Sequence, residues 1–172
     1  AGRFVPEKGV LQLAEAIKDL EADCNFFAVM AGDGPLRCKA QQLGAAHLAT
    51  PGTLSKSDLA ALLLQADALC LPSRSEGFCT LLLDAAACGT AIIATDVGGM
   101  HEIAPTNEYG ILLESMNASD VKAALEKAAS SRTAIKYMGE QLAARVRSQC
   151  TWRESANKLI QEAQASASDD PK

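Results

Sequence analysis

The chain contains 172 residues, which is enough for one domain with a substantial hydrophobic core. With 48% hydrophobic residues, 22% charged residues and a formal net charge of -5, the composition is globular and lacks the basic excess typical of nucleic-acid-binding proteins. No apolar run approaches the roughly 20 residues of a membrane-spanning helix, and residues 1–9 lack a signal-peptide pattern, so we expect a cytoplasmic protein.

The first part of the chain alternates between helical and strand patterns. Residues 9–22 carry apolar side chains at helical spacing, and residues 25–32 form a short apolar run ending in glycine, which is typical of a buried strand. A second helix is predicted to start near Pro35 and to end near Gly44. Residues 47–52 then form a weak strand candidate.

The remaining chain continues this alternation and then becomes wholly helical. The predicted elements are, in order, a helix at 55–66, a strand at 67–73, a loop and a helix buried all round within 73–90, a strand at 91–95, a short helix at 100–104, a strand at 110–114 and helices from about 118. Apolar strands that lack alternation and are separated by helices indicate a parallel sheet. The predicted fold class is therefore α/β: a doubly wound, mostly parallel sheet with helices on both faces and a helical C-terminus.

Four loops follow the predicted strands, and ligands of open α/β sheets bind at such loops, beyond the carboxyl ends of the strands. The loops are "GRFVPEKG", "AGDGP", "PSRSEGF" and "TDVGG". The first of them would follow a strand that mostly precedes residue 1, so we expect the natural chain to extend upstream. The polar residues of all four loops are predicted to gather at one edge.

Gly77 directly precedes the predicted buried helix. The backbone amides of Phe78, Cys79 and Thr80 would lack acceptors within that helix. Free amides together with the helix dipole favour an anion, most often a phosphate. The start of this helix is therefore a candidate anion site.

Charged residues accompany these amides. Arg3 and Lys8 would lie at the end of another strand and together suit a diphosphate, although each alone also fits a solvated surface charge. Glu76 and Asp84 suggest sugar hydroxyls, because a carboxylate accepts two hydrogen bonds from neighbouring hydroxyl groups. The spacing equally fits a helix cap at Glu76 and, for a buried Asp84, pairing with Arg74 or a backbone donor.

The cysteines and histidines indicate no metal site. Six cysteines are present without a C-x-x-C pair, and there are only two histidines. Most of the cysteines lie in apolar runs, where a thiol acts as a small hydrophobic group in a reducing compartment. Cys79 leaves a redox role as an alternative, because a thiol at a helix N-terminus can have a lowered pKa.

The motifs "GRFVPEKG", "AGDGP", "PSRSEGFCTLLLDAAACGTAIIATDVGGMHEI" and "YGILL" occur in an order that resembles the C-terminal, donor-binding half of the GT-B fold glycosyltransferases, specifically the retaining family four. The similarity covers about residues 2–163. It implies that Arg3 and Lys8 hold the donor diphosphate, that Glu76 contacts the donor sugar and that Asp84 contacts the ribose. Because of this resemblance we count Arg3, Lys8 and Glu76 as catalytic.

The same resemblance implies a set of donor-binding residues. They are Gly2, Asp33, Gly34, Gly77, Phe78, Cys79, Thr80 and Asp84. Asp33 is expected to make a turn with Gly34 beside the nucleotide pocket. Two positions depart from the family: Asp84 is shorter than the usual Glu, and Cys79 replaces a Gly, so that its side chain would crowd the phosphate or force a positive φ.

Residues 98–102 give weaker signals. Gly98, Gly99 and Glu102 match the family, but a loop that caps a helix explains them nearly as well. His101 is expected to be a surface or capping histidine. Trp152, the only tryptophan, is expected to pack at the start of a C-terminal helix.

The resulting hypothesis is that residues 1–165 form the nucleotide-sugar-binding domain of a metal-independent, cofactor-free retaining glycosyltransferase that uses a UDP or GDP sugar, with a disordered tail at 166–172. The acceptor domain would lie upstream, so this chain alone is expected to bind nucleotide without transferring sugar. Membrane contact is expected only through the missing half. The alternative is a non-catalytic nucleotide-binding or regulatory module. An NAD-dependent Rossmann protein is disfavoured because no G-x-G-x-x-G follows an early strand.

Overall fold

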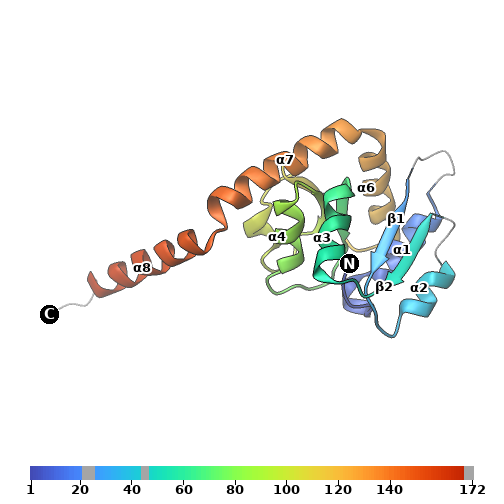
Figure 1. The fold of residues 1–172 in the computed structure, drawn as a ribbon, viewed down its shortest axis with the longest axis horizontal. Coiled ribbons are helices and arrows are strands. Elements are labelled where there is room, and N and C mark those ends of the chain that lie inside the picture. Colours follow the sequence, from blue (N-terminus) through green and yellow to red (C-terminus); the bar gives the residue numbers. More distant parts are fainter. Residues whose placement is uncertain (21–25, 44–46, 169–172) are drawn as a thin grey trace.

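The computed structural model describes residues 1–20, 26–43 and 47–168 (Figure 1). Its elements are the 3-10 helix η1 (Pro6–Lys8), α1 (Val10–Lys18), β1 (Ala28–Ala31), α2 (Arg37–Leu43), β2 (Leu48–Gly52), α3 (Lys56–Gln65), β3 (Ala68–Leu71), α4 (Thr80–Ala87), β4 (Ala91–Thr95), α5 (Met100–Ile103), β5 (Gly110–Leu113), α6 (Ala118–Ser130), α7 (Arg132–Gln149) and α8 (Trp152–Ser168). Gly44 and the ends of two predicted elements, at 21–22 and 25, lie outside the described residues.

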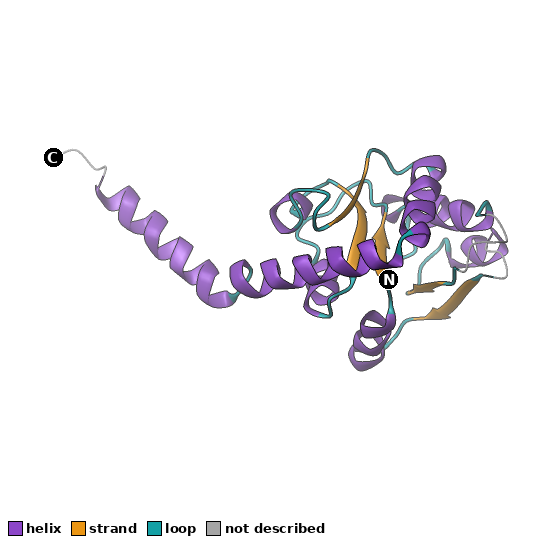
Figure 2. Cartoon of the chain, turned by 90° about the horizontal axis from the view of Figure 1, so that it is seen from above, coloured by secondary structure: helices purple, strands orange, loops and turns teal. Residues whose placement is uncertain are grey.

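The strands are parallel, as predicted, but they form two groups. Strand β1 pairs with β2, and β3, β4 and β5 form a separate three-stranded sheet in that order. Figure 2 shows the two groups standing apart, with helices around both. The α/β prediction with helices flanking parallel strands and a helical C-terminus is confirmed.

The burial of strand β4 shows that its sheet is covered on both faces, as predicted. All five of its residues are buried. Ile93 packs in a cluster with residues of α1 and α6, whereas Ile92 packs with residues of α4, α5 and α7 on the other side. A strand buried on both faces loses the alternation of apolar and polar residues, which is the pattern in its sequence.

Helix α4 corrects one prediction. Leu82, Ala85 and Ala86 are buried, but Asp84 and Ala87 are exposed, so the helix is not buried all round. The apolar sequence of this helix predicted burial on every side. Because alanine is small, exposing it to water costs little free energy, so an alanine-rich helix can have one side in solvent. Asp84 therefore needs no partner to offset burial.

The C-terminal helix corrects a second prediction. Helix α8 extends away from the rest of the molecule (Figures 1 and 2), and the Trp152 side chain is 93% exposed instead of packed. The helix continues through Ser168, so residues 166–168 of the predicted tail are helical, and residues 169–172 lie outside the described part. None of the described helices is both long and apolar enough to span a bilayer.

Candidate functional site

The first residues of the chain run along the loop that follows β1. The Gly2 amide donates to the Ala31 carbonyl at 2.9 Å, and the Phe4 amide donates to the Asp33 carbonyl at 2.8 Å. A Cβ at Gly34 would lie 2.7 Å from the Phe4 carbonyl oxygen, so only glycine permits this approach. These contacts fix the backbone on either side of residue 3.

Arg3 is exposed at the point where this backbone is fixed, and its guanidinium has no ion-pair partner among the residues described. Asp33 accepts a hydrogen bond at 2.8 Å from the amide of Gly34, which is the turn expected from the sequence. Its carboxylate also lies 3.8 Å from Arg37. Arg3 is thus a cation at this edge that forms no ion pair with the described residues.

Lys8 and Glu76 form the shortest ion pair of the site. Lys8 Nζ lies 2.6 Å from Glu76 Oε2, and the two side chains are 25% and 9% exposed. The buried Ser73 hydroxyl donates to Glu76 Oε1 at 2.7 Å, and Thr95 donates to the Ser73 carbonyl. Glu76 therefore does not cap α4; it is held between a cation and a hydroxyl.

Two glycines bring the loops of this site together. Gly9 has φ +63°, and a Cβ there would collide with the Pro72 carbonyl oxygen. Gly98 has φ +61°, and a Cβ there would collide with the Glu76 carbonyl oxygen. The loops after β3 and β4 thus touch through backbone atoms, and this contact sets the position of Glu76.

The N-terminus of α4 lies beside this ion pair. Cys79 is the N-cap, with φ -79°, and positive φ is confined to glycines in the described part of the chain. The expectation that a side chain at 79 could force a positive φ is therefore wrong. The Phe78, Cys79 and Thr80 amides have no hydrogen-bond acceptor within the described ranges, so these donors remain available to an anion.

The environment of Cys79 argues against a lowered pKa. Burial raises the pKa of the Cys79 thiol, and the hydrogen bond from the Leu82 amide offsets only part of this rise. Glu76 raises it further, and Lys8 opposes that effect. The thiolate needed for redox chemistry is thus disfavoured, and the structure contradicts the premise of the redox alternative.

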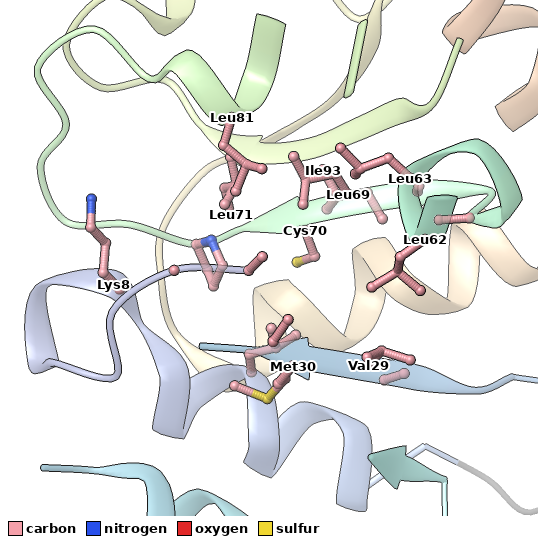
Figure 3. Close-up of a pocket in the computed structure, with 18 of the residues that line it drawn as sticks. Lys8, Val29, Met30, Leu62, Leu63, Leu69, Cys70, Leu71, Leu81 and Ile93 are labelled. Atoms are coloured by element: carbon pink, nitrogen blue, oxygen red, sulfur yellow. The ribbon is translucent and has the colours of Figure 1, made fainter. Parts of the chain in front are cut away.

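Two cavities adjoin these groups. A cavity of about 740 Å³ has walls that include Gly2, Arg3, Lys8, Glu76, Phe78, Cys79 and Thr80. A smaller cavity of about 300 Å³ shares Gly2 and Arg3 with the first, and its walls also include Asp33, Thr53 and Leu54. Arg3 borders both cavities, and Lys8 stands at one end of the larger cavity (Figure 3).

The remaining candidates lie outside the walls of both cavities. They are Gly34, Gly77 and Asp84. Gly77 is exposed and has open space around it. Asp84 is exposed on α4 and forms no ion pair or hydrogen bond through its side chain with Arg74 or with any other described residue. His101 is a surface histidine whose ring nitrogen lies 3.1 Å from Asp96.

Sequence reasoning missed Ser73 and Thr95. A serine three residues before an acid is a weak signal, because only the backbone path of the loop decides whether the hydroxyl reaches the carboxylate.

No group of three or more His, Cys, Asp or Glu side chains within the described ranges is arranged to hold a metal ion. The polar groups brought together are therefore two cations, one acid, a hydroxyl and free amides.

Known proteins are similar to this chain in sequence and in structure. Residues 1–164 match the family described as "Glycosyl transferases group 1". An uncharacterized glycosyltransferase of Methanocaldococcus jannaschii is 36% identical over 143 residues, which cover 81% of this chain and 40% of that protein. The chain therefore spans less than half the length of this curated relative.

Solved structures show the same fold. Sucrose-phosphate synthase from Thermosynechococcus elongatus aligns with a TM-score of 0.80 at 20% identity, covering 97% of this chain and 45% of that one. The Anabaena protein Alr3699/HepE in complex with UDP-glucose aligns with a TM-score of 0.76 at 20% identity, covering 96% of this chain and 48% of that one.

Proposed function

Because this chain belongs to the glycosyl transferases group 1 family, we propose that it is the donor-binding half of a longer retaining glycosyltransferase. The substrate would be a nucleotide diphosphate sugar, with UDP or GDP as the nucleotide. A hexose would pass to an acceptor held by an upstream domain. The UDP-glucose complex of the structural relative from Anabaena supports this class of donor.

One observation carries the proposal: Arg3, Lys8 and the free amides at the start of α4 border one cavity. A diphosphate carries charge on adjacent phosphates, and guanidinium, ammonium and amide donors stabilise that charge at the same time. Departure of the nucleotide leaves negative charge on the diphosphate. Groups already in place for that charge lower the barrier by electrostatic stabilisation, and no metal is required for this role.

Lys8 and Glu76 would change partners when the donor binds. In the structure the Lys8 ammonium is neutralised by Glu76 at 2.6 Å. A diphosphate that reaches Lys8 competes with Glu76, and the displaced carboxylate oxygen becomes an acceptor for a sugar hydroxyl. Ser73 keeps Oε1 in place during this exchange, because its hydroxyl donates to that oxygen.

Asp84 is assigned to the ribose. Its exposed carboxylate on α4 has no competing partner among the described side chains, so both oxygens can accept hydrogen bonds from the ribose hydroxyls. Because Asp84 borders neither cavity, the ribose would lie at the outer edge of the site. The nucleotide base would then reach the region of Asp33 and Thr53.

Calorimetric titration with UDP, GDP and ADP tests the proposal. We expect saturable binding of one nucleotide, and Arg3→Ala should weaken it at least tenfold because a charge-assisted hydrogen bond contributes about 1.5–3 kcal/mol. Asp84→Ala should also weaken it. Lys136→Ala, which removes an exposed lysine on α7, is the matched control and should bind like the unchanged chain.

Two results separate the alternatives. If none of the three nucleotides gave a binding signal, the result would favour a regulatory module that has lost its nucleotide site. Sugar transfer by the 172-residue chain alone would contradict the assignment of the acceptor site to a missing domain.

A further inference from the structure

We propose that Arg145 of α7 is a positioning residue for the start of α4. Its side chain holds α5 in place, and α5 in turn holds the loop after β4 against the backbone of Gly77, directly before the free amides of α4. For the ligand of those amides the inference rests on the donor site proposed above, whereas the effect of Arg145 on the loop does not.

The Arg145 side chain completes the end of α5. Its Nε donates to the Ile103 carbonyl at 3.0 Å, and its Nη2 donates to the Glu102 carbonyl at 3.0 Å. The last carbonyls of a helix lack partners within it, and no backbone amide of the described residues donates to either of these two. Helix α5 has only four residues, so it is not stable by itself. Arg145 therefore satisfies the two acceptors at its end.

Tyr109 fixes the orientation of the Arg145 guanidinium. The guanidinium carbon lies 5.3 Å from the centroid of the Tyr109 ring, and the face of an aromatic ring attracts a cation. Tyr109 is half-buried and directly precedes β5. A guanidinium offers several donors in a rigid plane, whereas a lysine ammonium is a compact point charge. The contact with two neighbouring carbonyls therefore depends on the shape of the arginine as well as on its charge.

The loop between β4 and α5 depends on what holds its two ends. Gly98 and Gly99 have no side chain to pack, and glycine permits many backbone conformations. At the start of the loop, the Thr95 hydroxyl donates to a carbonyl of the loop after β3. At its end, α5 buries two apolar side chains. This burial holds the inner face of α5, but only Arg145 satisfies the carbonyls at its end.

Backbone contacts connect this loop to the start of α4. The Gly99 amide donates to the Gly77 carbonyl at 3.0 Å, and a Cβ at Gly99 would lie 3.0 Å from the Phe78 ring. Gly77 and Phe78 directly precede Cys79, the N-cap of α4. A displacement of α5 would thus reach the amides of α4 through the loop. Arg145 borders neither cavity, so it acts through this loop without touching a ligand.

The test compares Arg145→Met with Arg147→Met. Arg147 is the matched control, because it also lies on α7 and donates to one helix carbonyl, that of Ala87 at 3.2 Å, but at the opposite end of α4. Methionine keeps an unbranched apolar stem and removes the donors. The measurements are Gly99 amide hydrogen exchange, the amide chemical shifts of residues 78–80, and calorimetric titration with UDP, GDP and ADP, all well below both thermal midpoints.

We expect Gly99 exchange in Arg145→Met to be at least about fivefold faster than in Arg147→Met, which is the factor of one ordinary hydrogen bond. The chemical shifts of residues 78–80 should change in Arg145→Met alone. The nucleotide that binds the unchanged chain should bind Arg145→Met at least about fivefold more weakly than Arg147→Met. A merely structural role would lower the thermal midpoint without these local effects.

Arg145→Lys serves as the test if Arg145→Met does not fold. It keeps the charge but does not reproduce the planar fork, so its Gly99 exchange should also exceed that of Arg147→Met.

Equal Gly99 exchange in the Arg145 and Arg147 variants would overturn the proposal. Faster exchange with unchanged nucleotide affinity would also overturn it, because the loop would then not position the amides. If the unchanged chain binds none of the three nucleotides, the donor site fails instead. In that case the chemical shifts decide: a change at residues 78–80 in Arg145→Met alone supports the positioning role, and the absence of a change overturns it.

Discussion

At the scale of single residues, the pair of Lys8 and Glu76 has a measurable consequence for stability. Lys8→Met leaves the 9% exposed Glu76 carboxylate with only the Ser73 hydroxyl as a partner. A largely buried acid without its cation is costly, and because Lys8 remains partly exposed we expect a loss of about 2 kcal/mol in the free energy of unfolding. Urea denaturation measures this loss.

A double variant separates the pair from the packing around it. Lys8→Met combined with Glu76→Gln should recover most of the loss, since no uncompensated charge then remains. Additive effects of the two substitutions would show that the ion pair does not link these residues.

Cys79 gives a second prediction at this scale. Burial raises the pKa of its thiol, and only the thiolate reacts with alkylating agents. Iodoacetamide at pH 7 should therefore modify Cys79 more slowly than the exposed Cys38, and the rate at Cys79 should keep rising at pH values above the usual thiol pKa, because its own pKa is raised. Peptide mass spectrometry measures both sites in one sample. Faster modification of Cys79 at neutral pH would restore the redox alternative.

At the scale of elements, the loop from β4 into α5 depends on Gly98. This residue has φ +61°, and a Cβ would lie 2.7 Å from the Gly77 carbonyl oxygen and closer still to that of Glu76. Left-handed backbone costs other residues about 1–2 kcal/mol, and the overlap adds to it, so Gly98→Ala should lower the free energy of unfolding by more than about 2 kcal/mol.

Gly77→Ala is the matched control for this loop. A Cβ at Gly77 meets no atom within 4 Å, so chemical denaturation should show a change within about 0.5 kcal/mol. Similar losses for the two variants would mean that the contact between the loops does not depend on close backbone approach.

The elements also show where sequence reasoning succeeds. Strand β4 was predicted at 91–95 and is found at Ala91–Thr95, because a strand buried on both faces is a continuous apolar run. Arg3, Lys8, Glu76 and Asp84 were predicted to share one pocket because parallel strands end at the same edge of a sheet; the first three border one cavity, whereas Asp84 lies outside its walls.

Sequence reasoning failed where the outcome depends on surroundings. Helix α4 and Trp152 were expected to be buried because they are apolar, yet the exposure of Asp84 and of Trp152 depends on which neighbours cover them. The pairing of Lys8 with Glu76 depends on the path of two loops, and no local pattern encodes that path. The sequence therefore allowed the candidate residues to be identified, but it did not allow the exposure of their side chains or the paths of the loops to be predicted.

At the scale of the whole molecule, the proposed donor site is built by distant segments of the chain. The first residues, the loop after β1, the loop after β3 and the loop after β4 meet through backbone contacts at Gly34, Gly9 and Gly98. The site therefore depends on the assembly of both groups of strands. We infer that nucleotide binding and global folding are linked, because a ligand held by all of these loops binds the folded state alone.

Helix α8 stands apart from this assembly, and its removal provides the last prediction. Its large apolar side chains are exposed, with Trp152 at 93%, Leu159 at 67% and Ile160 at 55%, so they contribute little to the core. Deleting residues 152–172 should change the thermal midpoint by less than about 2 °C, as circular dichroism would show. In the full chain, acrylamide should quench Trp152 nearly as well as free tryptophan. Truncation after Gln141, which removes the buried Leu142 and Val146 of α7, should abolish the transition. A large loss on deleting α8 alone, or a shielded Trp152, would mean that α8 packs against the domain in solution.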